Sequence, residues 1–282
     1  MTEEQNNGQL KIGELPEMQI VSMDAVVLHE DPDTERVAQL IERFSADGVL
    51  KNPPVVARAG KSDKLIVLDG ANRITTLQKL DIPHVLVQIV DLPDTALTID
   101  CWHHAVEYLT SEMLLAEIAG IEGVTVVEGS NLDRDDTSLL CRLIFTDGEH
   151  LLLRGSSDLI ESVRQLQAFT RTYHRFAYFD RVSYTNIDHL RLNYRNFTTL
   201  VSFRGYSKDD LRTITSHGVR VPSGITRVLL PKRALRFNLR LDTLRSGLTL
   251  EEKQVWLKET IRSRVAEKSI RFYREPTFMF DE

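Results

Sequence analysis

The stretch KLIVLDGANR, residues 64–73, decides the fold of the first part of this chain. Its apolar residues predict a buried strand, the Asp69-Gly70 pair predicts a turn, and residues 74–80 continue as a helix. A glycine turn between a strand and a helix directs free backbone N–H groups at an anion, and the helix dipole and Arg73 add positive charge. The stretch therefore indicates a phosphate-binding turn, although a plain strand-to-helix turn would also use a single glycine.

The overall composition is that of an ordinary globular protein. The chain has 282 residues, of which 42% are hydrophobic and 27% charged, and its formal net charge is −6. This length allows two domains, or one domain with a large extension. The acidic balance argues against a protein that coats nucleic acid without specificity, while a local basic face stays open.

Cysteine usage and hydropathy point to the cytoplasm. Cys101 and Cys141 form neither a zinc-binding spacing nor a disulfide framework, which favours a reducing compartment. No stretch approaches the roughly 18–20 apolar residues needed to cross a bilayer. Residues 1–13 are polar and acidic, unlike a signal peptide. We therefore expect a cytoplasmic protein with no membrane partner and with residues 1–17 as a flexible tail.

Residues 18–92 are expected to form a compact α/β unit. Hydrophobic periodicity and turn residues predict its elements. The first helix is capped by Asp33 or Thr34, has apolar residues at helical spacing and ends at Gly48. The expected strands lie within 18–28, 53–58, 65–68 and 85–90, and the expected helices span 34–47 and 74–80.

Residues 93–282 are expected to form a second, mixed α/β domain that completes the site, so the fold class is α/β (α+β). The boundary rests on the turn-forming residues 91–94, and the aromatic tail 275–282 is expected to pack against the protein. The expected strands are 97–104, 124–127, 139–145, 150–153, 176–184, 198–203 and 233–241. The expected helices are 111–121, 159–173, 209–217 and 250–268, the last with Leu250, Val255, Trp256, Ile261 and Val265 inside.

Four features stand in a fixed order in the first unit. They are Leu28-His29-Glu30, the helix that ends at Asp47-Gly48, the segment 50–56 with its Pro-Pro pair, and the box 68–73. In this order they resemble the ParB/sulfiredoxin-like N-terminal fold. The resemblance implies that the box at the strand-to-helix turn binds nucleotide phosphates.

Further features after residue 95 extend the resemblance over most of the chain. They are Trp102-His103-His104 behind an apolar strand, the loop 222–227, and the C-terminal residues 275–282. With these, the chain resembles the ParB-like free serine kinases, which convert L-serine to O-phosphoserine. The end of the chain resembles the version found in siderophore gene clusters, where phosphoserine feeds diaminopropionate synthesis. The resemblance implies Mg²⁺ and either ATP or ADP as the phosphoryl donor.

The resemblance implies two catalytic carboxylates. Glu30 would accept the proton of the serine hydroxyl, and Asp69 would orient the turn or hold Mg²⁺, directly or through water. On the residues alone, Glu30 also fits a surface glutamate in an acidic run, and Asp69 fits a helix cap. Relatives often have His-His-Arg where this chain has Ala71-Asn72-Arg73. Asn72 cannot transfer a proton as histidine does, so the proton chemistry is assigned to Glu30.

Two segments are expected to bind the phosphates. The turn supplies backbone N–H groups and a guanidinium, and the loop 222–227 supplies hydroxyl and N–H groups followed by an arginine. Each segment could also be a plain surface turn, and Lys51 could be a solvated side chain. The expected phosphate-binding residues are Lys51, Gly70, Ala71, Asn72, Arg73, Ser223, Gly224, Thr226 and Arg227.

Trp102, His103 and His104 are expected to form the amino-acid pocket. A tryptophan can enclose a small substrate, and a neighbouring histidine can meet its carboxylate, although Trp102 could also belong to the core. Adjacent strand residues face opposite ways, so only one histidine can share a face with the pocket. The pair has no third ligand at useful spacing and is not expected to bind a metal by itself.

Two other functions stay open. The first is a ParB-like DNA-binding regulator, since Arg and Lys recur in 227–240 and 262–274, but such runs fit a solvated face about as well. The second is a nucleotide-binding switch of the ParB type that hydrolyses CTP and has no small-molecule substrate. The sequence does not distinguish ATP from ADP, and it leaves the oligomeric state open.

Overall fold

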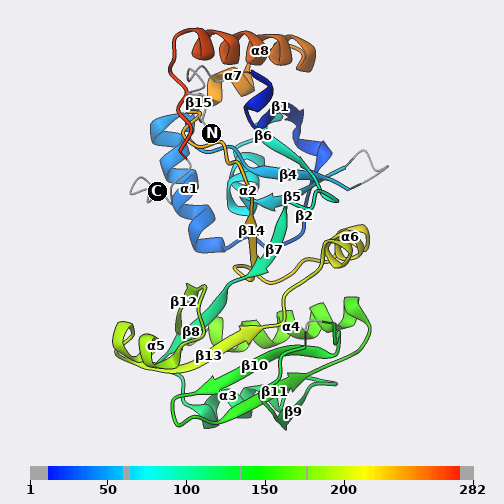
Figure 1. Ribbon diagram of the computed structural model, residues 1–282, viewed down its shortest axis with the longest axis vertical. Helices are drawn as coiled ribbons and strands as arrows, with labels where there is room; N and C mark the ends of the chain where they lie inside the picture. Colours follow the sequence, from blue (N-terminus) through cyan, green and yellow to red (C-terminus); the bar gives the residue numbers. More distant parts are fainter. Residues whose placement is uncertain (1–11, 60–63, 134, 176, 274–282) are drawn as a thin grey trace, which may run out of the picture.

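Two units stacked along the long axis make up the molecule (Figure 1). The computed structural model describes residues 12–59, 64–133, 135–175 and 177–273. Each unit has its own β-sheet, and the C-terminal part of the chain returns from the second unit to the first. The fold is therefore mixed α/β, as the sequence predicts.

The first unit contains a five-stranded mixed sheet in the order β1-β6-β4-β5-β2. β5 pairs in parallel with β2 and antiparallel with β4, while β6 pairs in parallel with β4 and antiparallel with β1. The strands are β1 (Glu17–Ser22), β2 (Val26–Leu28), β4 (Val55–Arg58), β5 (Leu65–Asp69) and β6 (His84–Asp91). Two short 3₁₀ turns, Ile12–Glu14 and Met23–Ala25, flank β1.

Helices α1 (Thr34–Asp47) and α2 (Ala71–Lys79) border the functional end of this sheet. Asp33 caps α1 by accepting hydrogen bonds from the N–H groups of Glu35 and Arg36. Gly48 ends α1 in the left-handed conformation with φ 64°. α2 follows β5 directly after Gly70. The predicted strand–turn–helix order and the predicted ends of α1 are confirmed.

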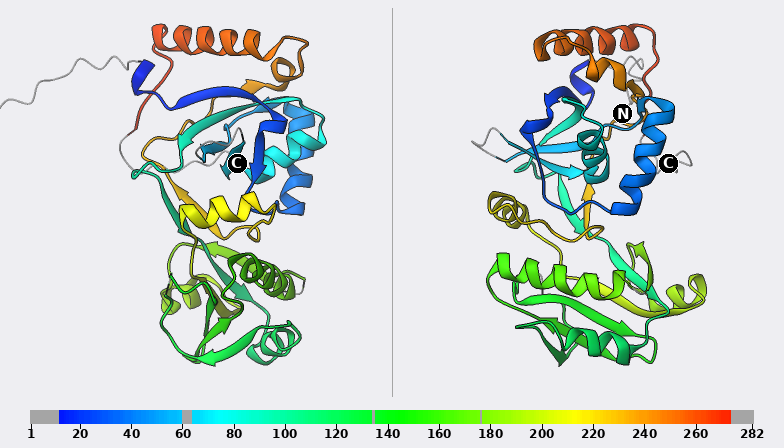
Figure 2. Two further views of the ribbon diagram at one scale, coloured as in Figure 1. Left: turned by 90° about the vertical axis from the view of Figure 1, so that its right-hand side faces the viewer. Right: turned by 180° about the vertical axis from the view of Figure 1, so that it is seen from behind.

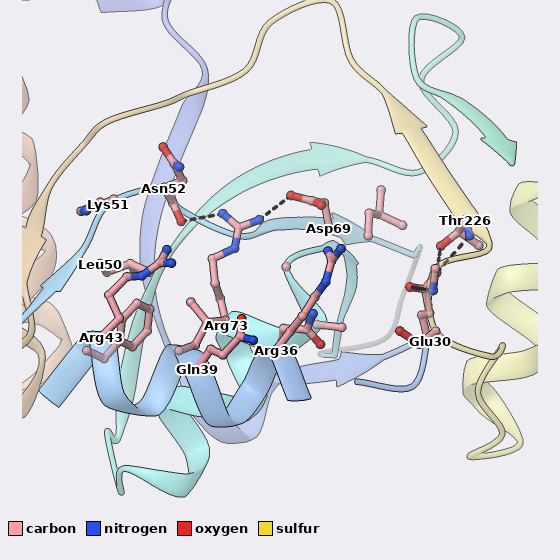
Figure 3. Close-up of a pocket in the computed structure, with 18 of the residues that line it drawn as sticks. Glu30, Arg36, Gln39, Arg43, Leu50, Lys51, Asn52, Asp69, Arg73 and Thr226 are labelled. Atoms are coloured by element: carbon pink, nitrogen blue, oxygen red, sulfur yellow. Dashed lines mark hydrogen bonds and ion pairs between the residues drawn. The ribbon is translucent and has the colours of Figure 1, made fainter. Parts of the chain in front are cut away.

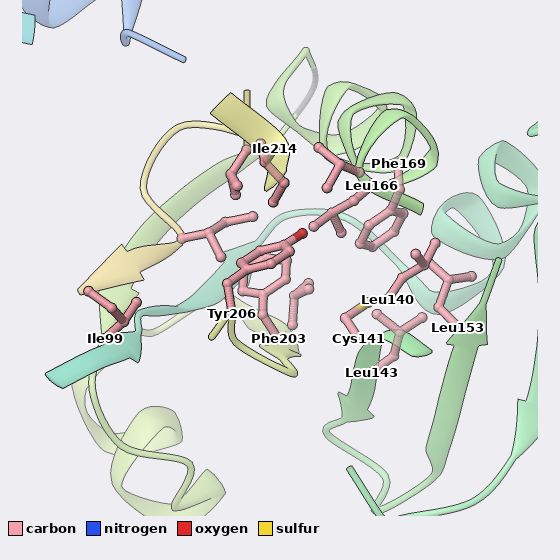
Figure 4. Close-up of a cluster of buried hydrophobic side chains, with 14 of the residues drawn as sticks. Ile99, Leu140, Cys141, Leu143, Leu153, Leu166, Phe169, Phe203, Tyr206 and Ile214 are labelled. Atoms are coloured by element: carbon pink, nitrogen blue, oxygen red, sulfur yellow. The ribbon is translucent and has the colours of Figure 1, made fainter. Parts of the chain in front are cut away.

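The second unit is built on a six-stranded antiparallel sheet in the order β12-β8-β13-β10-β11-β9. Its core packs residues of this sheet against several helices (Figure 4). The same cluster includes Ile66 and Leu68 of β5 in the first unit. The strands are β8 (His103–Glu107), β9 (Thr125–Glu128), β10 (Leu139–Phe145), β11 (His150–Arg154), β12 (Tyr178–Val182) and β13 (Phe197–Phe203). The helices are α3 (Ser111–Ile118), α4 (Leu159–His174), α5 (Ile187–Asn193) and α6 (Lys208–Ser216).

A two-stranded ribbon joins the units. β7 (Thr98–Cys101) leads out of the first unit, and β14 (Thr226–Leu229) returns beside it, antiparallel. The sequence predicts a loop over 219–227, but Thr226 and Arg227 already belong to β14. A single bridge between Glu30 and Val221 ties the preceding loop to the first unit. The ribbon therefore carries residues 223–226 to the end of β2.

Residues 239–266 pack on the first unit, at the end remote from the second (Figure 2). β15 (Leu239–Arg240) pairs with β3 (Val49–Leu50), and α7 (Leu241–Arg245) and α8 (Leu250–Ala266) follow. Their buried side chains join the core of the first sheet. The predicted domain boundary at residue 93 stays a prediction. The packing shows that α7 and α8 contribute to the same core as residues 18–92.

Two expectations for the C-terminal part are wrong. The strand predicted over 233–241 is limited to two residues, because the preceding segment crosses the first unit as a loop with positive φ at Arg236 and Asn238. Val255 is 55% exposed, whereas Lys253 is fully buried. The Lys253 ammonium is accommodated because it donates to two backbone oxygens and to His84 Nδ1. The predicted packing of 275–282 lies outside the described residues.

Candidate active site

A cavity of about 550 Å³ lies between α1, the start of α2 and the loop 223–226 (Figure 3). Glu30 and Thr226 are at one end, and Leu50 and Lys51 are at the other. The structure brings together most of the residues that the sequence singles out. Those that line the cavity are Glu30, Lys51, Asp69, Gly70, Ala71, Asn72, Arg73, Trp102, Ser223, Gly224 and Thr226.

The Asp-Gly turn has the geometry of an anion-binding turn. Gly70 has φ 98°, a conformation that favours glycine, and no side chain caps the helix that it opens. A Cβ at this position would lie 3.0 Å from Pro54 Cβ and 3.1 Å from Arg73 Nε. Glycine is therefore required here both by the backbone and by space. The N-terminal residues of α2 border the cavity, where their N–H groups and the helix dipole attract negative charge.

Asp69 holds two arginines at the edge of this turn. Its Oδ2 is 2.6 Å from Arg73 Nη2 and 2.7 Å from Arg233 Nη2. Burial alone would raise the pKa of Asp69, but the two guanidinium groups outweigh it and lower the pKa below its ordinary value. Arg73 also donates to the backbone oxygen of Asn52, at 2.8 Å. Asp69 thus orients Arg73, and its predicted catalytic role stays a prediction.

The side chain of Asn72 has a structural partner. Its Oδ1 accepts a hydrogen bond of 2.8 Å from the backbone N–H of Asp33. Asp33 is the cap of α1, so this bond couples the starts of α1 and α2. Lys51, at the far end of the cavity, forms an ion pair of 3.6 Å with Asp47.

The loop 223–226 donates its hydrogen bonds to the carboxylate of Glu30. Gly224 N–H donates to Glu30 Oε1 at 2.7 Å, and Thr226 N–H donates to Oε2 at 3.0 Å. The Thr226 hydroxyl also contacts Oε2. The sequence expectation that this loop offers its N–H groups to a nucleotide phosphate is therefore not met in this structure. The loop instead holds the carboxylate of Glu30, a residue that lines the cavity.

Arg227 does not line the cavity. Its guanidinium lies 4.7 Å from the centre of the Trp102 ring and 3.8 Å from Asp100 Oδ2. This cation–π contact positions Trp102, which does border the cavity. Arg227 thus supports a cavity residue, whereas the sequence expectation is a direct contact with phosphate.

The two histidines predicted for the amino-acid pocket do not line the cavity. His103 begins β8 opposite Val182. His104 is fully buried, and burial holds its pKa well below the ordinary value. Its Nε2–H donates to the Gly224 oxygen at 3.2 Å, and its Nδ1 is 2.6 Å from the Tyr173 hydroxyl. His104 therefore supports the Gly224 turn from behind, because its strand turns it into the core of the second unit.

Six polar residues that line the cavity were not predicted as site residues: His29, Arg36, Gln39, Arg43, Asn52 and Arg181. Arg36, Gln39 and Arg43 point into it from one face of α1 (Figure 3). Their helical spacing on the side away from Val37 could have revealed them. Arg181 comes from β12 in the second unit and donates to Ser223 Oγ at 3.2 Å. No sequence pattern links it to Glu30, because the two residues are far apart in the chain.

Arg181 also explains why position 224 is occupied by glycine. Gly224 has φ 81°, and a Cβ there would overlap the Arg181 guanidinium. Burial lowers the pKa of Arg181 from its ordinary value. This guanidinium therefore lies directly against the turn that holds Glu30, so a cation and a carboxylate meet at the same end of the cavity.

The arrangement can bind an anionic ligand and accept a proton. The cationic side chains that line the cavity are Arg36, Arg43, Lys51, Arg73 and Arg181. Within the residues that the structure describes, no group of three or more His, Cys, Asp or Glu side chains could hold a metal ion. In the same part of the chain, no helix is both long enough and apolar enough to cross a membrane.

Several arginines that suggested DNA binding have partners within the protein. Arg233 pairs with Asp69, and Arg240 is 3.1 Å from Asp242 Oδ2. Arg264 donates to the Phe237 oxygen and lies over its ring at 4.3 Å. These three arginines therefore have contacts within the protein, and the Arg240–Asp242 pair lies on the surface.

No protein-family model matches the chain. The ATP-dependent L-serine kinase SbnI of Staphylococcus aureus is 21% identical over 270 residues, which cover 94% of this chain and 97% of SbnI. A solved structure of SbnI with a C-terminal truncation has a TM-score of 0.71 at 18% identity, covering 90% of this chain and 97% of the other. A solved structure of a free serine kinase with a glutamate-to-alanine substitution, in complex with AMP, has a TM-score of 0.70 at 14% identity. The match covers 82% of this chain and 94% of the other. The chain therefore shares the fold of these proteins.

Proposed function

We propose that this protein is a free L-serine kinase that transfers a phosphoryl group from ATP or ADP to the serine hydroxyl, giving O-phospho-L-serine. The observation that carries the proposal is the position of Glu30. Its carboxylate is held by the loop 223–226 at the end of a cavity that also contains an open helix N-terminus and a set of arginines. The similarity to SbnI over 94% of the chain supports it.

Phosphoryl transfer to a hydroxyl requires alignment, neutralisation of charge and an acceptor for the hydroxyl proton. The start of α2, from Gly70 to Arg73, would bind the nucleotide phosphates, and Arg36 and Arg43 would add positive charge. Apolar side chains at the Lys51 end, among them Phe44 and Leu50, would contact the base and ribose. The transferred group would then lie toward Glu30.

Serine would bind between Glu30 and Trp102 at the other end of the cavity. Glu30 would accept the proton of its hydroxyl, and Arg181 would stabilise the charge on the transferred phosphoryl group. Trp102 would enclose the small substrate against solvent. The second unit would thus supply the arginine, while the first unit supplies the base and the nucleotide site.

Magnesium fits this cavity as a companion of the nucleotide. Only Glu30 and Asp69 among its lining residues carry carboxylates, and both are already engaged by donors. The phosphate oxygens would therefore be the main ligands, with Asp69 as an outer contact. Bound there, the ion would neutralise charge on the phosphates.

We also infer that residues 18–92 are a ParB/sulfiredoxin-like nucleotide-binding domain, that the enzyme acts in the cytoplasm, and that its phosphoserine feeds diaminopropionate synthesis for a siderophore. The resemblance of the box 68–73 and of residues 275–282 supports this assignment.

Phosphorus NMR of the protein with L-serine and Mg²⁺, in separate samples with ATP, ADP and CTP, tests the function. We expect an O-phosphoserine resonance with ATP or ADP. If neither nucleotide yields phosphoserine, the kinase is refuted, and phosphate release from CTP without serine would favour the nucleotide switch.

A further inference from the structure

His29 precedes Glu30 and is buried, with 2% of its surface exposed. Its Nδ1 contacts the backbone oxygen of Val67 in β5. A carbonyl oxygen can only accept a hydrogen bond, so Nδ1 must carry the hydrogen. This contact determines the tautomer of the ring and leaves Nε2 as the nitrogen whose protonation can change.

The Thr226 hydroxyl lies between His29 and Glu30. His29 Nε2 is 2.8 Å from Thr226 Oγ1, and the same Oγ1 contacts Glu30 Oε2. A hydroxyl has one hydrogen, so it can donate to only one of these neighbours, and the other neighbour must donate to it. Either an imidazolium donates to Thr226 and Glu30 is a carboxylate, or Glu30 is a carboxylic acid and His29 is neutral.

Both alternatives contain one proton more than a neutral imidazole and a carboxylate. The Thr226 hydroxyl therefore links both groups to that proton. We propose that His29 is a positioning residue for the catalytic base: through Thr226 it extends Glu30 into a two-site proton acceptor. This inference rests on the proposed kinase activity and adds to it where the serine proton goes.

In the reactive form, Glu30 is a carboxylate, His29 is neutral and the Thr226 hydroxyl donates to His29 Nε2. The serine oxygen bonds to phosphorus while the bond from phosphorus to the leaving phosphate oxygen breaks, and the serine proton passes to Glu30. Glu30 then donates to Thr226 Oγ1, and the hydroxyl proton passes to His29 Nε2. The product is an imidazolium beside a carboxylate, one of the two arrangements that satisfy every contact.

Charged groups approach this chain of hydrogen bonds from several elements. Asp69 at the end of β5 interacts electrostatically with His29, and Arg181 from β12 does so with Glu30. Asp31, next along the chain, lies 4.0 Å from Arg220 in an ion pair. The variants below leave all of these groups in place, so a change in pH dependence reports on His29 and Thr226.

His29→Gln tests the proposal, because a glutamine amide can reach Thr226 but cannot accept a proton. We expect kcat to fall about tenfold or more, while the serine KM and the nucleotide Kd change less than about twofold. The acid limb of the kcat/KM profile should move to lower pH by about one to two units, since ordinary histidine and glutamate pKa values differ by about two. An acid limb at the same pH in both proteins overturns the proposal. His189→Gln, the same change at an exposed histidine, is the control.

Two further measurements keep the proposal testable if His29→Gln does not fold. Thr226→Val removes only the bridging hydroxyl and should shift the acid limb as His29→Gln does, whereas Thr226→Ser should restore it. Nitrogen NMR of labelled histidine, followed against pH, reads the His29 ring without turnover. Glu30→Gln should change that titration, and an unchanged curve would refute the coupling. A wild-type protein that makes no phosphoserine would refute the kinase instead, and the NMR titration would still decide the coupling.

Discussion

The turn 69–73 and the loop 223–227 look alike in sequence and differ in the structure. Both contain a glycine with positive φ, and both end in an arginine. At the turn, no side chain caps the helix, and its N–H groups border the cavity. At the loop, Gly224 and Thr226 donate to Glu30. The first segment is therefore suited to a ligand, while the second holds Glu30, the proposed base.

The difference between the turn and the loop predicts that nucleotide binding and phosphoryl transfer depend on different segments. Changes at the turn should affect nucleotide affinity, and changes at the loop should affect turnover. Each prediction below tests one side of this division, beginning with the largest expected effect.

Glu30→Gln should lower kcat at least about a thousandfold, because the amide cannot accept the serine proton. Nucleotide affinity, measured by calorimetry, should stay within about threefold of wild type. Loss of nucleotide binding would show that Glu30 is mainly structural and would remove the distinction between loop and turn.

Arg181→Ala should lower kcat about a hundredfold, since it removes the cation beside the transferred group. Arg220→Ala is a matched control, because Arg220 is an exposed arginine of the neighbouring loop that does not line the cavity. Steady-state kinetics with serine and nucleotide varied in turn provide the measurement. Equal losses in both variants would contradict a specific role for Arg181.

Gly70→Ala and Gly224→Ala form the direct test of the two segments. Both place a side chain at positive φ, which costs about 1–3 kcal/mol of stability. Gly70→Ala should raise the nucleotide Kd about tenfold because the Cβ meets Pro54 and Arg73. Gly224→Ala should instead lower kcat, because the Cβ displaces Arg181. If both variants lose affinity and turnover in the same proportion, the division between the segments is wrong.

Asp69→Asn should have the smallest effect, visible in the pH dependence of stability. The folded pKa of Asp69 lies below the ordinary value of about 3.9, so its stabilising contribution is complete above that value and is lost as pH falls through the folded pKa. Thermal unfolding of wild type and variant should therefore differ at neutral pH and converge in acid. Arg233→Gln should reduce the difference, and a difference independent of pH would exclude the ion pairs as its source.

The local elements of the site could be predicted because their causes are local. The buried strand before Asp69, the need for glycine at residue 70 and the cap at Asp33 follow from hydrophobic periodicity and backbone conformation. The prediction of a serine kinase that uses ATP or ADP, made on resemblance, agrees with the name of the relative SbnI, which specifies ATP. Glu30 was selected correctly as a cavity residue, and its catalytic role stays a prediction.

The errors concern side chains whose environment depends on distant parts of the chain. His104 was placed in the substrate pocket, but its strand turns it toward Tyr173 and the back of Gly224. Arg227 was assigned to phosphate, but Trp102 and Asp100 take it. Arg181 was missed because only the pairing of β12 with β8 brings it to the cavity.

By itself, the sequence determined the strand–glycine–helix turn, since a short run of apolar residues and one glycine leave few backbone conformations open. It also determined which carboxylate stands at the end of β2. Only the tertiary structure decided what each donor meets. The backbone N–H groups of the two segments have the same chemistry. Whether a protein carboxylate or a ligand accepts their hydrogen bonds depends on the tertiary structure, which brings Glu30, Arg181 and Gly224 together.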